Sequence, residues 1–205
     1  MKKVFLCFAC VGMMLNISAQ EAPNTQMSMP KHEVYGGFGL LNDNQMIAMI
    51  ADVLSTVLTG GYLVQPDTYH ALTPFVGYRH WFTNRFGLGG TFAFDVNSVK
   101  LYNGDSEHYQ MQKVNRYYLT FAVEPIFNYV YKPAWQLYGS LGLGTTIVTF
   151  ANATFNDGTN AKLSLAYVNA HFTPIGVRFG KEFGGFVELG YGYKGILNAG
   201  VNYRF

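Results

Sequence analysis

Nucleophilic catalysis needs a hydroxyl or thiol beside a histidine base, and an acidic group that orients the histidine. The pair in this sequence that could meet in this way is His70 and Ser98, with Asp67 or Glu107 as the acidic group. Both lie equally far from Asn84, so they would face each other if the chain turned there. No catalytic motif surrounds them, and polar side chains at an exposed rim also bind water or lipid headgroups. We therefore expect no catalytic site, with His70 and Ser98 as the alternative.

Metal and cofactor chemistry is not indicated by the remaining residues. The other histidines show no metal-ligand spacing; they are His32, His80, His108 and His171. The glycines between 139 and 144 and between 185 and 192 are not followed by the Lys-Ser/Thr of a phosphate-binding loop. They lie in alternating segments, where glycine lets a strand bend and leaves room in a crowded interior. We expect no metal and no cofactor.

A second group of residues carries charges that could form ion pairs. Arg178 and Glu188 are placed symmetrically about Phe183-Gly184, so we expect them to face each other across neighbouring strands. Buried charges persist only when they are paired. The sequence therefore predicts an internal ion-pair plug, and a gated polar path is the alternative. Its members would be Arg79, Glu124, Arg178, Glu188 and Arg204, with Asp95 and Arg116 also inward-facing.

The elements that must position these charges are strands, because apolar and polar residues alternate. From 86 to 97, for example, Phe86, Leu88, Phe92 and Phe94 share one face, while glycine, threonine and Asp95 share the other. This pattern is typical of barrel strands with a lipid-facing and a lumen-facing side. It predicts eight strands, near 33–41, 70–83, 86–98, 113–130, 135–150, 163–182, 185–193 and 196–205.

The connections between these strands alternate between long and short, as expected when external loops are long and periplasmic turns are short. The long ones are 42–69, 99–112 and 151–162; the connection near Lys194 is short where a long one is expected. Within the first, apolar residues at helical spacing predict a short amphipathic helix over 43–58, capped by Asn42 or Asn44. Such a helix must cover the barrel, lipid or a partner.

The N-terminus has the order of a secretory signal peptide: Lys2 and Lys3, an apolar run, and small residues up to Ala19. We expect a signal peptide at 1–19, a periplasmic extension at 20–32 and a barrel at 33–205. Removing the signal removes both cysteines and leaves 12 basic against 12 acidic residues, which gives no indication of nucleic-acid binding.

Composition also favours a membrane location. Charged residues make up only 13% of the chain and aromatic residues 17%, whereas about 25% charged residues is usual in soluble domains. No window after the signal holds 18 uninterrupted apolar residues, so a helical membrane protein is excluded. Only helices and closed barrels satisfy their backbone groups in lipid. The fold class predicted is all-β, an eight-stranded antiparallel transmembrane barrel.

The last segment alternates up to a terminal aromatic residue, with Val201, Tyr203 and Phe205 on one face. It resembles the final strand of bacterial outer-membrane proteins, and the whole mature chain resembles small barrels of the OmpA/OmpX type. The resemblance implies an outer-membrane location in a Gram-negative bacterium, with lipid and lipopolysaccharide around the barrel. It also implies delivery by periplasmic chaperones and recognition of Val201, Tyr203 and Phe205 by the barrel-assembly machinery. Small porin-like barrels also include enzymes that modify lipid A.

Three functions follow from this interpretation. We expect a non-catalytic envelope protein, either structural or binding a surface partner through its external loops. The first alternative is an enzyme that modifies lipid A with His70 and Ser98. The second is a lateral conduit for small apolar molecules, because the interior of an eight-stranded barrel is just wide enough to be filled by side chains. The sequence does not identify a ligand.

Overall fold

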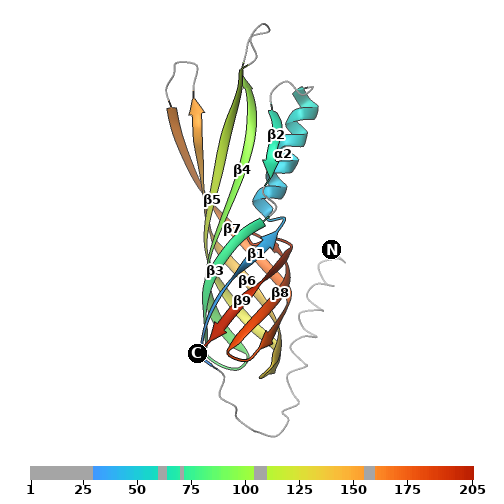
Figure 1. Ribbon diagram of the computed structural model, residues 1–205, viewed down its shortest axis with the longest axis vertical. Helices are drawn as coiled ribbons and strands as arrows, with labels where there is room; N and C mark the ends of the chain where they lie inside the picture. The colour runs from blue at the N-terminus through green and yellow to red at the C-terminus, as the bar shows by residue number, and fades with distance from the viewer. Residues whose placement is uncertain (1–29, 60–63, 70–71, 104–109, 155–159) are drawn as a thin grey trace, which may run out of the picture.

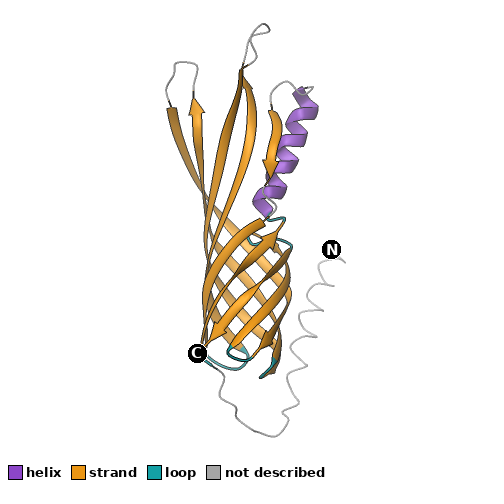
Figure 2. Ribbon diagram, viewed as in Figure 1, coloured by secondary structure: helices purple, strands orange, loops and turns teal. Residues whose placement is uncertain are grey.

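The computed structural model describes residues 30–59, 64–69, 72–103, 110–154 and 160–205 as one helix and nine strands (Figures 1 and 2). The helix is α2 (Asp43–Thr59). The strands are β1 (His32–Leu40), β2 (Val64–Tyr69), β3 (Leu72–Trp81), β4 (Phe86–Asn103), β5 (Gln110–Lys132), β6 (Trp135–Thr154), β7 (Asn160–Gly180), β8 (Phe183–Gly192) and β9 (Leu197–Arg204).

Eight of these strands close into a barrel. All pairs are antiparallel, and the order runs β4-β3-β1-β9-β8-β7-β6-β5 before β5 returns to β4. β1 closes the ring by pairing with both β3 and β9, through Tyr35 opposite Gly77 and Asn202. β2 lies beyond β3 and pairs with the upper part of β4. The predicted eight-stranded antiparallel barrel is therefore confirmed, as is the helix between its first two strands.

Side chains alternate between the two sides of the wall, as the period of a strand requires. On β4, Phe86 and Leu88 face outward, whereas Thr91 and Asp95 are buried in the lumen. The outer wall is apolar and the interior polar, which is the arrangement of outer-membrane barrels. The chain is thus an integral barrel protein of the outer membrane. None of the helices in the described part of the chain is long and apolar enough to span a bilayer.

The barrel is taller on one side than on the other. β1, β3, β8 and β9 have 8 to 10 residues, whereas β4 to β7 have 18 to 23. The short turns between β3 and β4, β5 and β6, and β7 and β8 lie at the end where the C-terminus lies, which we assign to the periplasm (Figure 1). The long strands continue past the opposite end as two hairpins, beside α2 and β2.

The connections predicted as long loops at 99–112 and 151–162 are largely strand. β4 and β5 stay paired up to Asn103 opposite Gln110, and β6 and β7 up to Thr154 opposite Asn160. The loop prediction was wrong here because polar residues outside the membrane hide the apolar alternation, while the backbone ladder simply continues. The predicted signal peptide and residues 20–29 of the extension lie outside the described residues.

Candidate functional site: the filled lumen and the external mouth

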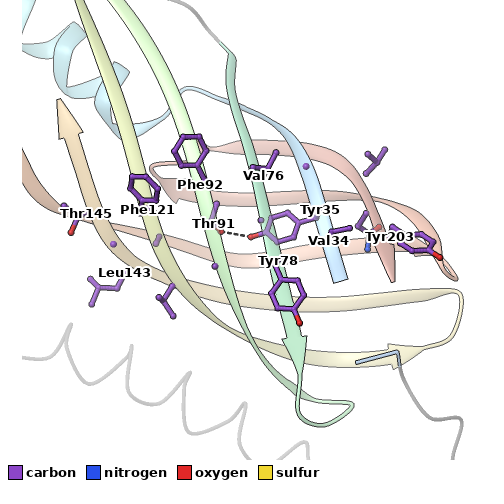
Figure 3. Close-up of a pocket in the computed structure, with 18 of the residues that line it drawn as sticks. Val34, Tyr35, Val76, Tyr78, Thr91, Phe92, Phe121, Leu143, Thr145 and Tyr203 are labelled. Carbon is purple, nitrogen blue, oxygen red and sulfur yellow. Dashed lines mark hydrogen bonds between the residues drawn. The ribbon is translucent and has the colours of Figure 1, made fainter. Parts of the chain in front are cut away.

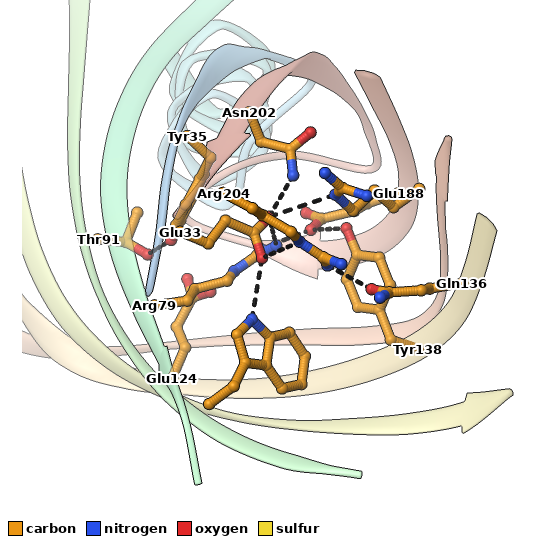
Figure 4. Close-up of polar contacts among 12 residues, drawn as sticks. Glu33, Tyr35, Arg79, Thr91, Glu124, Gln136, Tyr138, Glu188, Asn202 and Arg204 are labelled. Atoms are coloured by element: carbon orange, nitrogen blue, oxygen red, sulfur yellow. Dashed lines mark hydrogen bonds and ion pairs between the residues drawn. The ribbon is translucent and has the colours of Figure 1, made fainter. Parts of the chain in front are cut away.

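Arg79 of β3 lies at the centre of the lumen, where its guanidinium joins two groups of charges (Figure 4). Its NH2 donates to Glu188 at 3.0 Å, and NH1 lies 3.7 Å from Glu33. The guanidinium carbon also stands 4.0 Å from the centre of the Tyr35 ring, a cation–π contact. Tyr35 in turn hydrogen-bonds through its hydroxyl to Thr91 of β4, at 2.5 Å.

The first group of charges surrounds Glu33 of β1. Arg204 Nε donates to its carboxylate at 3.2 Å, and Arg178 Nε lies 3.9 Å away. Two neutral donors complete the shell: Asn202 Nδ2 at 2.6 Å and Trp81 Nε1 at 3.0 Å. Glu33 has no exposed surface. These donors stabilise a charge that would be costly to bury alone.

The second group surrounds Lys194, which comes from the turn between β8 and β9. Its Nζ lies 3.1 Å from Glu188 and 3.2 Å from Glu124. Each of these carboxylates also accepts a hydrogen bond from a tyrosine hydroxyl. Tyr138 donates to Glu188 at 2.7 Å, and Tyr193 donates to Glu124 at 2.6 Å. The lysine thus bridges two acids, Glu124 of β5 and Glu188 of β8, and shares Glu188 with Arg79.

Together these groups fill the barrel. Three carboxylates meet four cations, and none of the seven side chains is more than 3% exposed. They come from seven elements around the ring, so the network ties the wall together across its diameter. A buried ion cluster of this kind contributes less to net stability than to a single arrangement of the strands. The paired charges occupy this part of the lumen.

The residues predicted to form the plug are all found in or beside this network, but one predicted pair was wrong. Glu188 is registered with Gly176, and Arg178 with Phe186. The hairpin turns one residue earlier than assumed, and the register shifts again between Phe172 and Ile175. Arg178 therefore donates to backbone carbonyls in the β7–β8 turn, those of Gly180 and Lys181, at 2.6 and 2.7 Å.

Two of the seven charged members of the network, Glu33 and Lys194, were missed by sequence reasoning. Glu33 stands at the second position of a short, glycine-rich strand, and Lys194 lies in a turn where the two-residue alternation does not apply. Trp81, which donates to Glu33, is 2% exposed and faces the lumen, and no inward charge in the sequence marks it. Its position on β3, two residues after the inward-facing Arg79, was the signal that could have shown it.

The external mouth is closed by the first turn of α2. Asn42 caps the helix: its Oδ1 accepts from Gln45 N at 2.7 Å, and Gln45 Oε1 accepts from Asn42 N at 3.3 Å. This reciprocal pair is a capping box. The same side chains bind the wall, since Asn42 Nδ2 donates to Thr73 and Asp95 at 2.7 and 2.9 Å, and Gln45 Nε2 donates to Asp95 at 3.2 Å. Tyr167 of β7 donates to Asn44. Of the two predicted caps, Asn42 is the one used.

Asp43 sits in this mouth as a buried carboxylate. Burial raises its pKa to about 6, and the nearby Asp95 carboxylate acts in the same direction. Hydrogen bonds from the Asn44 backbone and the Asn169 side chain partly oppose this shift. A carboxyl that gains a proton near neutral pH therefore lies where the helix meets the barrel.

Beyond its first turn, α2 exposes most of its apolar side chains. Ile50, Val53, Val57 and Leu58 are between 61% and 76% exposed. The helix stands upright beside β2, above the short wall of the barrel (Figure 1). It carries no lysine or arginine. This external face, together with the two long hairpins, is the part of the protein that reaches farthest from the membrane.

The candidate catalytic pair cannot be assembled from the described residues. His70 and Glu107 lie outside them, and Asp67 is described only by its backbone in β2. Ser98 lies in β4, where its backbone pairs with Thr68. His80 is half-buried near the periplasmic end, where its ring lies tilted to that of His32 and edge-on to that of Phe82, with ring centres 5.0 and 4.9 Å apart. Within the described ranges no three His, Cys, Asp or Glu residues gather as metal ligands.

No protein-family model matches this chain, and no curated protein is similar to it. Solved structures with a similar fold include Ail, the attachment invasion locus protein of Yersinia pestis, in complex with the heparin analogue sucrose octasulfate. It is 17% identical, with a TM-score of 0.48, and the match covers 87% of this chain and all of Ail. The N-terminal β-barrel domain of Pseudomonas aeruginosa OprF is 12% identical over 87% of this chain and all of that domain, with a TM-score of 0.44.

Proposed function

We propose that this chain is a non-catalytic surface-binding protein that holds an external assembly above a closed barrel. The assembly consists of α2, β2, the β4–β5 hairpin and the β6–β7 hairpin. The observation that carries the proposal is the contrast between the two parts: the lumen is filled by paired charges, while the long strands continue outside the membrane. A barrel built to conduct solutes would need the space that Arg79, Glu188 and Lys194 occupy.

The chemistry of α2 indicates the kind of partner. Its exposed side chains are aliphatic, and it has no basic residue to attract a polyanion. Large exposed apolar patches mark sites of contact with proteins or membranes. We infer that the partner is a protein that covers the apolar face of α2, with the hairpins beside it.

The experiment is a binding assay on intact cells that display the protein. Chemical cross-linking from cysteines placed at Val53 and Val57 on α2, followed by mass spectrometry, identifies the partner. Val53→Lys and Val57→Lys are expected to abolish its recovery, whereas Val187→Lys on the lipid-facing wall of β8 tests assembly instead. Recovery that is equal in the wild type and in both α2 variants would overturn the proposal.

The two other functions have tests of their own. A mass-spectrometric comparison of lipid A from cells with and without the protein tests the enzyme, with His70→Ala and Ser98→Ala as controls. A change in lipid A that these variants abolish would replace the present proposal.

A lateral conduit needs an interruption between strands, and each of the eight barrel interfaces is paired in the described residues. Apolar solute uptake should therefore be the same in a deletion strain.

A further inference from the structure

The lipid-facing wall carries a groove of about 1000 Å³ that crosses six neighbouring strands, from β9 through β1, β3, β4 and β5 to β6 (Figure 3). Its two banks are rows of outward-facing residues in strand register. The upper row is Val201, Gly36, Val76, Phe92, Phe121 and Thr145; the lower row is Tyr203, Val34, Tyr78, Gly90, Val123 and Leu143.

Two glycines widen this groove. Gly36 stands in the upper row between Val201 and Val76, and Gly90 stands in the lower row between Tyr78 and Val123. A Cβ at Gly90 would meet no heavy atom closer than 3.9 Å, and one at Gly36 none closer than 3.5 Å. Neither glycine is therefore required by backbone crowding, and a side chain at either position would meet only ordinary van der Waals contacts.

The groove is long enough for one lipid chain. Six strands at about 4.8 Å spacing give a length of about 24 Å, and one leaflet of the hydrocarbon core is about 15 Å thick. Because barrel strands are tilted, a row perpendicular to them climbs through the membrane. Its low end is at Tyr203, close to the periplasmic end of β9, and its high end is at Leu143, well inside β6.

Polar and basic groups gather at the low end. Tyr78 hydrogen-bonds through its hydroxyl to His32 Nδ1 at 2.5 Å, and the exposed Lys31 precedes His32 at the rim. Around the whole periplasmic rim, the described exposed side chains include four basic ones and one acidic one: Lys31, Arg85, Lys132, Lys181 and Glu182. This excess of positive charge suits the phosphate of a phospholipid headgroup.

We propose that the groove holds one acyl chain of a periplasmic-leaflet phospholipid, whose headgroup phosphate lies at the rim beside Lys31. The chain enters at Tyr203, Val34 and Tyr78 and runs obliquely up the wall over Gly36 and Gly90. This site goes beyond the proposed surface binding, because it lies at the other end of the molecule. It makes one lipid a bound component of the wall.

The test is native mass spectrometry of the full-length protein, extracted from outer membranes in a mild detergent without refolding. The wild type is expected to carry one phospholipid per chain. Gly36→Leu and Gly90→Leu fill the groove from opposite rows, and each should lower the fraction that carries lipid at least fivefold. Val177→Phe is the control: this valine also faces outward, but on β7, where its neighbours Leu137 and Val187 lie outside the groove.

Folding is checked for every variant by its heat-modifiable mobility in electrophoresis, so a lost lipid is not confused with a lost barrel. Equal lipid retention in the wild type and both groove variants would overturn the proposal, as would a wild type that carries no lipid. A bound mass that corresponds to lipopolysaccharide would also overturn it, because that lipid belongs to the external leaflet.

Discussion

Lys194 Nζ lies 3.1 Å from Glu188 Oε2, although the lysine belongs to a turn at the external end of the barrel and the glutamate to the middle of β8. The lysine side chain reaches back into the lumen and has no exposed surface. It also binds Glu124 of β5, on the other side of the interior. One residue of a turn thus fixes the charge balance of the barrel core.

Lys194→Met should destabilise the barrel by about 3–5 kcal/mol, because it leaves the buried Glu124 without its cation and Glu188 with Arg79 alone. Urea unfolding in phospholipid vesicles measures this loss. Lys181→Met, at an exposed position in a periplasmic turn, should change stability by less than about 0.5 kcal/mol. The triple variant with Glu124→Gln and Glu188→Gln should recover much of the loss. An unfolding midpoint of Lys194→Met equal to that of the wild type would show that the network is not formed.

The two tryptophans should report opposite sides of the wall. Trp81 is 2% exposed in the lumen and donates to Glu33, whereas Trp135 is 38% exposed on the lipid face. In vesicles with brominated acyl chains, the Trp81→Phe variant, which keeps Trp135, should lose much of its fluorescence. The Trp135→Phe variant, which keeps Trp81, should be quenched little. Strong quenching of Trp81 would show that its indole ring faces lipid and not the lumen.

Two glycines of β1, three residues apart, should differ sharply in tolerance. A Cβ on Gly39 would overlap the carbonyl oxygen of Lys194, whereas at Gly36 the closest atom is Val76 Cγ1 at 3.5 Å. Gly39→Ala should therefore displace the β8–β9 turn and reduce the folded fraction, as seen by loss of heat-modifiable mobility. Gly36→Ala should fold like the wild type, and a failure of both variants would show that crowding at Gly39 is not what separates the two positions.

The attachment of α2 should weaken as the pH rises. Asp43 has its pKa raised from 3.8 to about 6 by burial, so the attached helix favours the protonated carboxyl. Below about pH 4 the Asp43 carboxyl is protonated whether the helix is attached or detached. Between pH 4 and 6 it ionises first in the detached helix, so the stabilisation of the attached state is progressively lost. Hydrogen exchange of the α2 amides, corrected for the intrinsic rate, should show more protection at pH 4 than at pH 7. Asp43→Asn should remove this difference.

The cap itself has a separate prediction. Asn42→Ala removes the helix cap and two hydrogen bonds to the wall, a loss of about 1–2 kcal/mol for the cap alone. Hydrogen exchange in α2 should accelerate at both pH values, while β4 to β7 keep their protection. Unchanged exchange in α2 would show that the helix is held by its apolar side and not by its first turn.

The fold was predictable from the sequence because lipid imposes a strict rule on every strand. The alternation of apolar and polar residues correctly predicted that Thr91, Glu124 and Arg178 face the lumen, because a strand has only two sides. It could not show which inward charges meet, because contact across a barrel depends on strand tilt and on bulges such as the one near Phe172. Arg79 therefore joins Glu188 through a geometry that no local pattern encodes.

The external part was less predictable. Capping residues and helical spacing predict the bounds of α2 to within one residue. The same kind of reasoning predicts loops where the structure has hairpins beyond the membrane. Outside lipid the constraint on alternate side chains disappears, so strands near Asn103 and Thr154 have ordinary polar sequences. The proposed surface function depends on this external part of the chain, where composition is the poorest guide to structure.

The contacts around Glu33 have a consequence for the order of assembly. Glu33 stands on the first barrel strand, while Arg204 and Asn202 stand on the last. A nascent sheet that lacks β9 leaves this carboxylate short of two partners in an interior that is losing water. The pairing of β9 with β1 therefore closes the barrel and supplies the partners of Glu33 in the same step. A sheet without β9 is unfavourable for this reason, and the closing step is cooperative.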